Sequence, residues 1–283
     1  FGCIVCPGFI DAHTHSDLMA LAEPLNEPKV LQGITTEVMA SDGIGYAPLS
    51  RKNQEMMLLL FSGVNGYPQL EYDWSTIAEY LQRFHHKTTC NVGCLIPNGC
   101  LRVEAMGWEN RPATSDEIKK MQDMIRQGME EGACGLSTGL QYPPGSWAST
   151  DELVELCKTV KECGGIYSTH VRYDLGDGVF DGFREALTIG IRSGCPVHLS
   201  HYYCTIPLRH QTEKMLGFID EGRARGVDLT FDSYPYEAGS TSMTIAIPQW
   251  AHNGGPHELL KRIKDKSTRE SMRGQSSSIL GQI

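Results

Sequence analysis

Apolar runs that end in polar residues recur along this chain at a nearly constant interval. The polar ends of four successive runs are Ser137, His170, His201 and Asp232, which lie 33, 31 and 31 residues apart. Near-continuous apolar runs are typical of strands that are buried on both faces of a parallel sheet. A (β/α)8 barrel of about 250 residues uses about 31 residues for each strand and its helix. The interval therefore predicts an α/β fold of the TIM-like (β/α)8 barrel type.

Seven such strands can be counted, and helix start signals lie between them. Thr114 with Glu117 and Ser149 with Glu152 each form a capping-box pattern. A doubly wound sheet would also alternate strands and helices, but no glycine-rich phosphate-binding motif follows the first strand. The strands are expected at 8–15, 34–41, 91–97, 133–139, 165–171, 196–202 and 227–234. Further helices are expected at 73–84, 178–193, 210–225 and 257–273.

Composition excludes several classes of partner. The chain has 25 Lys and Arg against 34 Asp and Glu, and this net charge of −9 argues against nucleic acid or an anionic membrane as a partner. The longest apolar run, 56–61, is far shorter than the ~18 residues that a membrane span needs. Ten cysteines are spread along the chain without the spacing of a disulfide framework, so we expect a reducing cytoplasm. The lone C-x-x-C of Cys3 and Cys6 has no second pair to support a metal or redox site.

Metal-binding residue types gather at the predicted carboxyl ends of the strands, where such barrels carry their active sites. His13 and His15 close the first strand, Asp42 follows the second, and His170 and His201 end the fifth and sixth. Residues two apart on a strand point to the same face, and two imidazoles facing one way suit Zn²⁺ or a similar ion. One such histidine alone would more often be a core residue, but the recurrence at successive strand ends favours a metal centre.

Two other strand-end residues receive no catalytic role from the sequence. His198 has the opposite alternation from His201 and is expected to face the helices. Asp232 is interpreted as structural.

No lysine or glutamate ends the fourth strand in GACGLSTGL, so a carbamylated lysine that bridges two metals has no candidate there. The loop SYPYEAGST at 233–241 offers hydroxyl and backbone N–H donors for a substrate anion.

These motifs together resemble the amidohydrolase superfamily, and within it the N-acyl-D-amino-acid deacylases, or D-aminoacylases. PGFIDAHTHSD and GITTEVMASDG are similar to the first two strand motifs of that family, and GLSTGLQYPPGSWAST, YSTHVR, LSHYY and YPYEAGST match those of the fourth to seventh strands in order. The STGLxYPP and YPYxAGST pair is more specific to the deacylases than H-T-H is. The resemblance covers nearly the whole chain. It implies zinc-dependent hydrolysis of the amide bond of N-acyl-D-amino acids, which are small-molecule substrates, to a carboxylate and a free D-amino acid.

The resemblance also implies how the candidate ligands divide between two metal sites. His170 and His201 would bind a tightly held zinc together with Asp42, which stands where the family has a cysteine. Two histidines and one carboxylate are a known ligand set for catalytic zinc. His13 and His15 would form or complete a weaker second site, with Asp42 bridging the two.

Substrate contacts are implied in the same way. By resemblance, the contacts of the family to the substrate carboxylate map onto Tyr142, Tyr234 and Ser240. Tyr203 stands where the family often has a lysine, so one cationic contact is missing. Arg172, two residues after His170, is expected to compensate for that loss.

The expected domain organisation follows from the same resemblance. Residues 1–283 would form a catalytic barrel domain that is truncated at both ends, with the eighth strand and the small β-sandwich domain of the family outside it. The catalytic aspartate of the family ends the eighth strand, so the general acid and base is expected beyond Ile283. Two alternatives stay open: another cyclic-amide or dipeptide amidohydrolase such as a hydantoinase, dihydroorotase or isoaspartyl dipeptidase, and a metal-binding relic without turnover. The acyl group, the D-side-chain preference and the oligomeric state stay open as well.

Overall fold

Successive parallel strands form the centre of the molecule. The computed structural model describes residues 2–173, 180–204, 208–236, 238–273 and 275. Its strands pair in chain order, β1 to β3 in one sheet and β4 to β8 in another, and every pair is parallel. The predicted α/β barrel-type architecture is therefore confirmed. The strands are β1 (Phe9–Asp11), β2 (Ile34–Met39), β3 (Asn91–Cys94), β4 (Ile96–Pro97), β5 (Gly135–Gly139), β6 (Ile166–His170), β7 (Val197–Leu199) and β8 (Leu229–Phe231).

The strands follow a curved path that brings the first and last of them together. The predicted third strand is split at Leu95 into β3 and β4, so the seven predicted strands correspond to the eight observed. Among the described strands no pairing joins β8 to β1, and the arrangement is an arc rather than a closed barrel. The arc is nevertheless curved enough that His13 Nδ1, after β1, lies 3.0 Å from Asp232 Oδ2, after β8. Residues from both ends of the arc therefore share one site.

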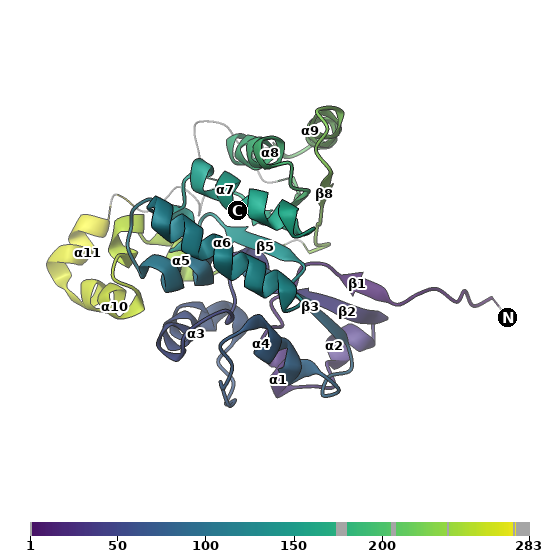
Figure 1. Cartoon of the computed structure of the whole chain (residues 1–283), viewed down its shortest axis with the longest axis horizontal. Helices are drawn as coiled ribbons and strands as arrows, with labels where there is room; N and C mark the ends of the chain where they lie inside the picture. The colour runs from purple at the N-terminus through teal and green to yellow at the C-terminus, as the bar shows by residue number, and fades with distance from the viewer. Residues whose placement is uncertain (1, 174–179, 205–207, 237, 274, 276–283) are drawn as a thin grey trace.

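Helices connect consecutive strands and pack against each other in chain order (Figure 1). The helix α6 packs against α5 on one side and α7 on the other, and α7 packs against α8. The α-helices are α1 (Met19–Ala22), α2 (Glu27–Val30), α3 (Arg51–Asn65), α4 (Ile77–Phe84), α5 (Asn98–Met106), α6 (Ser115–Glu130), α7 (Thr150–Glu162), α8 (Asp181–Ser193), α9 (Thr212–Ala224), α10 (Pro256–Lys264) and α11 (Lys266–Met272). The 3-10 turns are η1 (Ser41–Gly43), η2 (Gly145–Trp147), η4 (Met243–Ala246) and η5 (Gln249–His252).

The predicted helix signals are confirmed in part. Thr114 and Glu117 form the complete capping box at the start of α6. At α7 the Ser149 side chain accepts the N–H of Glu152, but the Glu152 carboxylate turns inward to another partner, so the full capping box predicted there is wrong. The single helix predicted at 257–273 is also wrong, because Asp265 adopts an extended conformation that ends α10. Its carboxylate then caps α11.

The core lies between the sheet and these helices. Leu136 on β5 and Tyr167 on β6 are fully buried, and Met121 and Ile125 of α6, four residues apart on one helix face, are equally buried. Burying an aliphatic side chain of this size stabilises a fold by about 1.5–3 kcal/mol. The core thus holds the strands in position, and the polar residues that follow the strands are left to build a site.

One ion pair is buried within this framework. Arg102 on α5 and Glu152 on α7 are fully buried, and Arg102 Nη1 lies 2.5 Å from both carboxylate oxygens of Glu152. A further Arg102 nitrogen, Nη2, donates to the backbone oxygen of Arg111 at 2.7 Å. The pair therefore joins two helices that lie on either side of α6.

Removing one member of this pair is expected to destabilise the protein strongly. Glu152→Ala leaves the Arg102 guanidinium buried without its counter-charge, which costs about 3–5 kcal/mol in the free energy of unfolding. The matched control is Glu155→Ala on the same helix, because Glu155 pairs with Lys158 at the surface and such pairs contribute about 1 kcal/mol or less. Urea unfolding of both variants measures the difference. Equal losses in the two would contradict this account of the buried pair.

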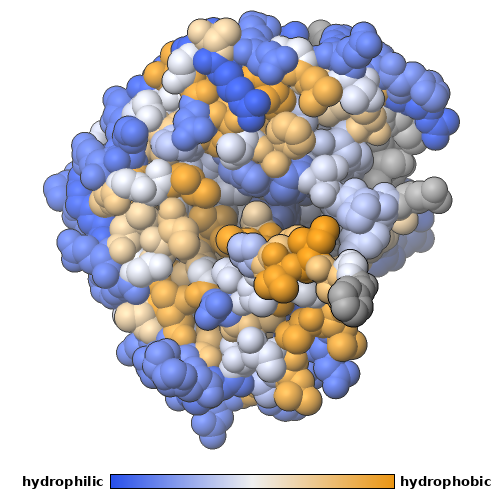
Figure 2. All heavy atoms as spheres, turned by 90° about the vertical axis from the view of Figure 1, so that its right-hand side faces the viewer, coloured by the Kyte–Doolittle hydropathy of each residue, from blue (hydrophilic) through white to orange (hydrophobic). Residues whose placement is uncertain are grey.

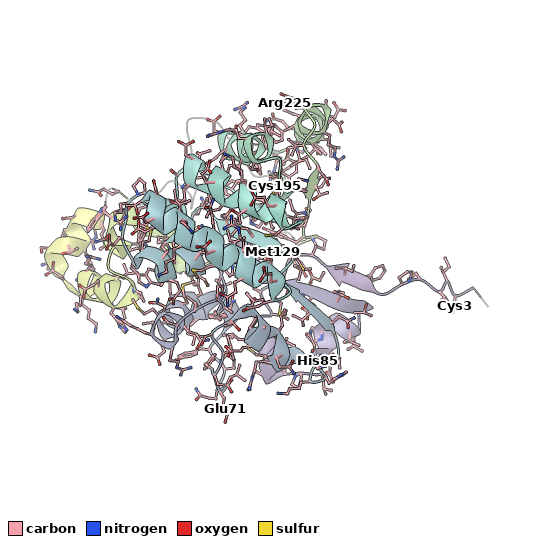
Figure 3. The ribbon with its side chains drawn as sticks, viewed as in Figure 1. Cys3, Glu71, His85, Met129, Cys195 and Arg225 are labelled. Carbon is pink, nitrogen blue, oxygen red and sulfur yellow. The ribbon has the colours of Figure 1, made fainter. Side chains whose placement is uncertain are left out.

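The N-terminal segment extends away from the rest of the chain, and Cys3 lies on it (Figure 3). It projects from the side seen in Figure 2, where apolar side chains border a hollow. Ile4 and Val5 are more than nine-tenths exposed.

All ten cysteines are free, and five of them are buried. In the part of the chain that the structure describes, no helix combines the length and the apolar character needed to cross a bilayer.

Candidate metal centre and its cavity

A tight turn after β2 presents the carboxylate of Asp42. Three residues of this turn, Ala40, Asp42 and Gly43, have left-handed backbone angles with φ of 61°, 55° and 66°. Glycine and aspartate tolerate this region better than most residues do. Ser137 on β5 holds the turn, because its Oγ donates to the Ala40 oxygen at 2.5 Å and accepts the Gly43 N–H at 3.2 Å. The Asp17 carboxylate accepts the Ala40 N–H at 2.9 Å.

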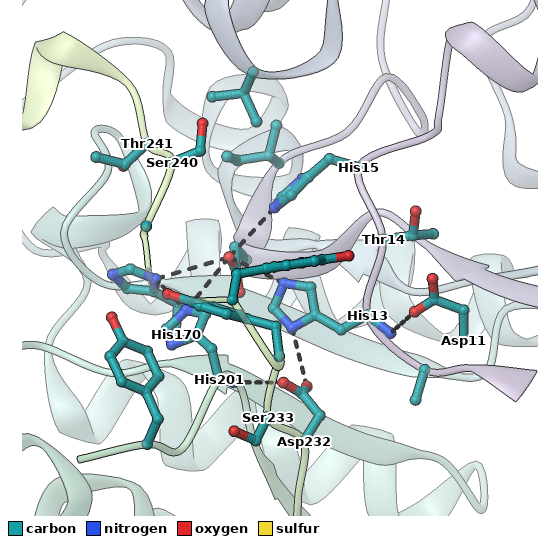
Figure 4. A pocket seen from close by; sticks show the side chains of 18 of the residues that line it. Asp11, His13, Thr14, His15, His170, His201, Asp232, Ser233, Ser240 and Thr241 are labelled. Atoms are coloured by element: carbon teal, nitrogen blue, oxygen red, sulfur yellow. Dashed lines mark hydrogen bonds and ion pairs between the residues drawn. The ribbon is translucent and has the colours of Figure 1, made fainter. Parts of the chain in front are cut away.

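Four histidines surround this carboxylate, and all four are labelled in Figure 4. Asp42 Oδ2 lies 3.3 Å from His13 Nε2, 3.5 Å from His15 Nε2, 3.7 Å from His201 Nε2 and 3.8 Å from His170 Nδ1. The structure thus brings together all five residues that the sequence singled out as metal ligands. They form two groups that share Asp42, one with His13 and His15 and one with His170 and His201.

The donor set of this cluster fits zinc. Four ligands at ~2.0–2.2 Å around a tetrahedral zinc lie about 3.3–3.6 Å apart, close to the separations around Asp42 Oδ2. The other oxygen, Asp42 Oδ1, is buried and has no hydrogen-bond partner within the described chain. Such an atom costs free energy unless something binds it. His170 Nδ1 and His201 Nε2 are 2.8 Å apart, so an ion between them would replace a shared proton.

Residues outside the cluster orient His170 and His201. His170 Nε2 donates to Gln141 Oε1 at 2.7 Å, which leaves Nδ1 free to face Asp42. His201 Nδ1 lies 3.1 Å from the Tyr173 hydroxyl, which leaves Nε2 facing the same point. Metal-binding histidines in proteins commonly use their second nitrogen in this way. Neither Gln141 nor Tyr173 was predicted from the sequence, although the position of Gln141 directly before Tyr142 is a signal that could have identified it.

Asp232 and His198 belong to the site, which corrects the expectation for both. Asp232 lines the cavity, and its Oδ2 accepts from His13 Nδ1 and His198 Nε2, both at 3.0 Å. His198 therefore contacts the site through Asp232 instead of facing only the helices. The alternation argument failed because β7 ends at Leu199, and His201 follows it in a left-handed conformation with φ of 37°.

Burial and charge act in opposite directions on two of the histidines. Burial lowers the pKa of His170 to about 4, because the low-dielectric surroundings favour the neutral ring. Burial also disfavours the charged form of His13, but the carboxylates of Asp42 and Asp232 outweigh it and raise its pKa to about 11. His170 is therefore a neutral ligand near pH 7, whereas an ion would have to displace a proton from His13.

A cavity of about 690 Å³ opens above the cluster. This volume is within the range of small-molecule sites. Three residues expected to contact substrate, Tyr142, Tyr234 and Ser240, line it together with Tyr203. The Tyr142 hydroxyl lies 2.8 Å from Thr241 Oγ1, and the rings of Tyr203 and Tyr234 are 5.0 Å apart. The cavity thus presents aromatic surface and hydroxyl groups beside the candidate metal ligands.

The structure does not bring Arg172 into this cavity. Arg172 Nε donates to the Glu185 carboxylate at 3.1 Å, and its two terminal nitrogens donate to the backbone oxygens of Ser146 and Ala148. These partners use the whole guanidinium group to hold the segment around η2 against α8. Arg172 therefore has a structural place, away from the position expected for a substrate contact.

Comparison with known proteins agrees with this geometry. The sequence model of the Amidohydrolase family matches residues 2–238. A D-aminoacylase of Alcaligenes xylosoxydans xylosoxydans is 37% identical over 245 residues, which are 86% of this chain and 49% of that protein. An N-acyl-D-glutamate deacylase of the same organism is 35% identical over 252 residues, or 88% of this chain and 50% of the relative. The chain thus spans about half the length of these curated relatives.

A solved structure shows the same relationship in three dimensions. The N-acyl-D-glutamate deacylase from Bordetella bronchiseptica, complexed with zinc and a phosphonate inhibitor that mimics the tetrahedral intermediate, superposes with a TM-score of 0.72. It is 33% identical, and the match covers 81% of this chain and 48% of that one. With the family match over most of its length and a His–Asp cluster at the carboxyl ends of its parallel strands, this chain belongs to the amidohydrolase family.

Proposed function

We propose that this chain carries the metal centre of a zinc-dependent hydrolase that cleaves the amide bond of N-acyl-D-amino acids. The observation that carries the proposal is the pair of ligand groups that share Asp42 at the base of a cavity of substrate size. The relatives named D-aminoacylase and N-acyl-D-glutamate deacylase support the substrate class. The products are a carboxylate and a free D-amino acid.

The proposed metal site has a tight part and a weak part. Asp42, His170 and His201 hold the tight zinc, and His13 and His15 complete a weaker site that shares Asp42. Burial supports this division through His170, which is buried, whereas His13, His15 and His201 are partly exposed and Asp42 belongs to both groups. A second support is that His15 Nδ1 is buried without a hydrogen-bond partner in the described chain, while His170 and His201 each have one.

The chemistry divides between the ion and the chain. Bound zinc supplies a Lewis acid that polarises the scissile carbonyl and lowers the pKa of an attacking water toward ~7. Gln141 and Tyr173 keep the ring nitrogens of His170 and His201 directed at one point. The hydroxyls of Tyr142, Tyr234 and Ser240 bind the carboxylate of the substrate, and Thr241 fixes the position of Tyr142. The acid and base aspartate expected beyond Ile283 stays a prediction, as do the β-sandwich domain and the eighth barrel strand, which would follow β8 because β3 and β4 together correspond to the third predicted strand.

Further parts of the proposal rest on the sequence. The substrate is a small molecule, and the free cysteines support a cytoplasmic location. The fourth predicted strand, which is β5, ends without a lysine or glutamate, which disfavours hydantoinase-like enzymes that bridge two metals with a carbamylated lysine. The metal-binding relic differs from the proposed enzyme only in turnover, so an activity measurement separates them.

Zinc-dependent release of a D-amino acid tests the proposed function. The intact zinc-replete protein is expected to hydrolyse N-acetyl-D-leucine and to leave N-acetyl-L-leucine intact, with the free amine measured by chromatography. Removal of the metal with a chelator is expected to abolish the reaction, and added zinc to restore it. Zinc binding without hydrolysis of any N-acetyl-D-amino acid would identify a relic. Hydrolysis that survives complete metal removal would refute the metal-dependent mechanism.

A further inference from the structure

One carboxylate connects the two groups of candidate metal ligands. Asp232 follows β8, and its two oxygens contact three residues that lie at the ends of two other strands, β1 and β7. Oδ2 accepts from His13 Nδ1, after β1, and from His198 Nε2, on β7, while Oδ1 accepts the backbone N–H of His201 at 2.6 Å. His13 belongs to one ligand group and His201 to the other. Figure 4 shows Asp232 below His13 and His201, with dashed contacts to both.

The contact with His201 is made to a strained part of the backbone. His201 has a φ of 37°, a left-handed value that a residue with a Cβ adopts at a cost. The Asp232 carboxylate is the acceptor for the N–H group in that conformation, so it stabilises the backbone that carries the ring. Without this acceptor the strand end could relax, and the ring of His201 would turn away from Asp42.

The contact with His13 determines which ring nitrogen faces the metal. A carboxylate only accepts hydrogen bonds, so Asp232 keeps a proton on His13 Nδ1, and Nε2, which lies 3.3 Å from Asp42 Oδ2, is the nitrogen left to exchange its proton for the metal. His198 holds the same Asp232 oxygen from the other side, and its own Nδ1 lies 2.8 Å from Thr230 Oγ1. The Asp232 side chain is therefore held between two rings and a backbone N–H, and it is only 18% exposed.

We propose that Asp232 is a positioning residue that holds His13 and His201, one ligand from each group, in a fixed relation around Asp42. Among the described strands β8 does not pair with β1. The Asp232 carboxylate therefore connects the two ends of the arc at a point where no strand pairing does so. The inference rests on the proposed metal centre but not on amide hydrolysis. Zinc binding without turnover would refute the proposed function and leave this inference intact.

The variant Asp232→Asn tests the inference because it keeps the shape and changes one acceptor into a donor. If the amide oxygen of the variant still accepts the hydrogen bond from the His201 N–H, the amide nitrogen faces His13 Nδ1. His13 Nδ1 must then accept a hydrogen bond from that nitrogen. The ring proton of His13 moves to Nε2, the atom that would bind the metal. Loss of such an orienting partner typically lowers metal affinity 10–100-fold. We therefore expect the zinc affinity of the intact protein, measured by competition with a chromophoric chelator, to fall by about 10–100-fold.

A matched control separates positioning from general effects of charge. Asp228→Asn makes the same chemical change at an exposed residue just before β8, and its zinc affinity is expected to equal that of the wild type. A merely structural Asp232 would lower the melting temperature of the metal-free protein and leave zinc affinity unchanged. Zinc affinity of a folded Asp232→Asn variant within about twofold of the control would overturn the inference.

A second measurement needs no Asp232 variant, so it holds even if that variant fails to fold. Nitrogen-15 NMR of the histidine rings in the zinc-loaded wild-type protein reports which ring nitrogen carries the proton. The His13 resonances are assigned by their absence in His13→Gln. A protonated Nδ1 with Nε2 free of a proton is the expected result. An unprotonated Nδ1 would overturn the inference, because Asp232 would then not be its acceptor.

Discussion

Replacing Asp42 by alanine is expected to abolish hydrolysis and to reduce bound zinc below about one tenth of the wild-type content. The reason is that Asp42 belongs to both ligand groups and is their only carboxylate. Loss of metal-dependent charge stabilisation is worth several kcal/mol, which lowers kcat/KM by on the order of 10³-fold or more. Zinc per chain by atomic absorption and release of a D-amino acid are the two measurements.

Two further substitutions at the same position separate a ligand from a turn residue. Asp42→Asn tolerates the left-handed turn, but its neutral amide oxygen lacks the charge that holds the ion, so we expect little zinc. Asp42→Cys is expected to keep zinc, because a thiolate is a good zinc ligand. The described contacts of the Asp42 carboxylate are all with histidine rings, and none is with the backbone of the turn. Full zinc content and activity in Asp42→Asn would contradict the ligand assignment.

The control for this series is a nearby buried carboxyl that belongs to neither group of candidate ligands. Asp17 accepts the Ala40 N–H and supports the same turn. Asp17→Asn keeps a carbonyl oxygen for that hydrogen bond, so zinc content and the fold are expected to persist. A loss of zinc in Asp17→Asn equal to that in Asp42→Asn would show that the turn, and not the ligand, controls binding.

Neutral side chains are expected to be strongly preferred over acidic ones in the substrate. We expect kcat/KM for N-acetyl-D-leucine to exceed that for N-acetyl-D-glutamate by on the order of 100-fold, because a second buried carboxylate would lack a counter-charge. Among the described residues that line the cavity, Lys29 is the one lysine or arginine, and Asp11 and Glu37 already neutralise it. The residues outside the described ranges include no lysine or arginine.

Sequence identity alone does not make this distinction. The D-aminoacylase and the N-acyl-D-glutamate deacylase are 37% and 35% identical to this chain, a difference too small to assign a side-chain preference. We expect the charges of the cavity to make it, because Tyr203 and Tyr234 present uncharged aromatic rings near His201.

A lysine in place of Tyr203 tests whether the charge of the cavity sets the substrate preference. Tyr203→Lys is expected to narrow the preference for leucine over glutamate by at least about tenfold, because it places a cation beside the side-chain region. Tyr67→Lys makes the same substitution at a residue that is 56% exposed and does not line the cavity, and is expected to leave the ratio nearly unchanged. Equal kcat/KM values for the two substrates in the wild-type protein would refute the predicted preference.

The architecture and the identities of the candidate ligands could be predicted from the sequence. Parallel strands that are buried on both faces must be apolar along their length, and the chain returns to the same end of the sheet after each helix. The positions of His170 and His201 are therefore set by the repeat itself, and the pairing of β5 with β6 and of β6 with β7 confirms the repeat.

Three features of the site were decided by tertiary contacts instead. The pattern near Arg172 is compatible with a substrate contact, but the Glu185 carboxylate of α8 and two backbone oxygens bind its guanidinium group. The alternation along β7 predicts that His198 faces the helices, but the strand ends at Leu199 and the ring of His198 reaches Asp232. Gln141 has no periodic signal, and only the packing of its loop against His170 shows what it does.

There is a physical reason why some features could be predicted from the sequence and others depended on the tertiary structure. Periodicity and residue type report where a side chain leaves the backbone and which chemistry it carries, so the sequence by itself determined the parallel α/β arrangement and the set of candidate His and Asp ligands. Hydrogen-bond partners depend on distances between segments far apart in the chain, such as the 3.0 Å between His13 Nδ1 and Asp232 Oδ2 across 219 positions. The curvature of the whole arc sets that distance. The tertiary structure alone therefore decided which carboxylate orients which ligand, and which cation stays away from the cavity.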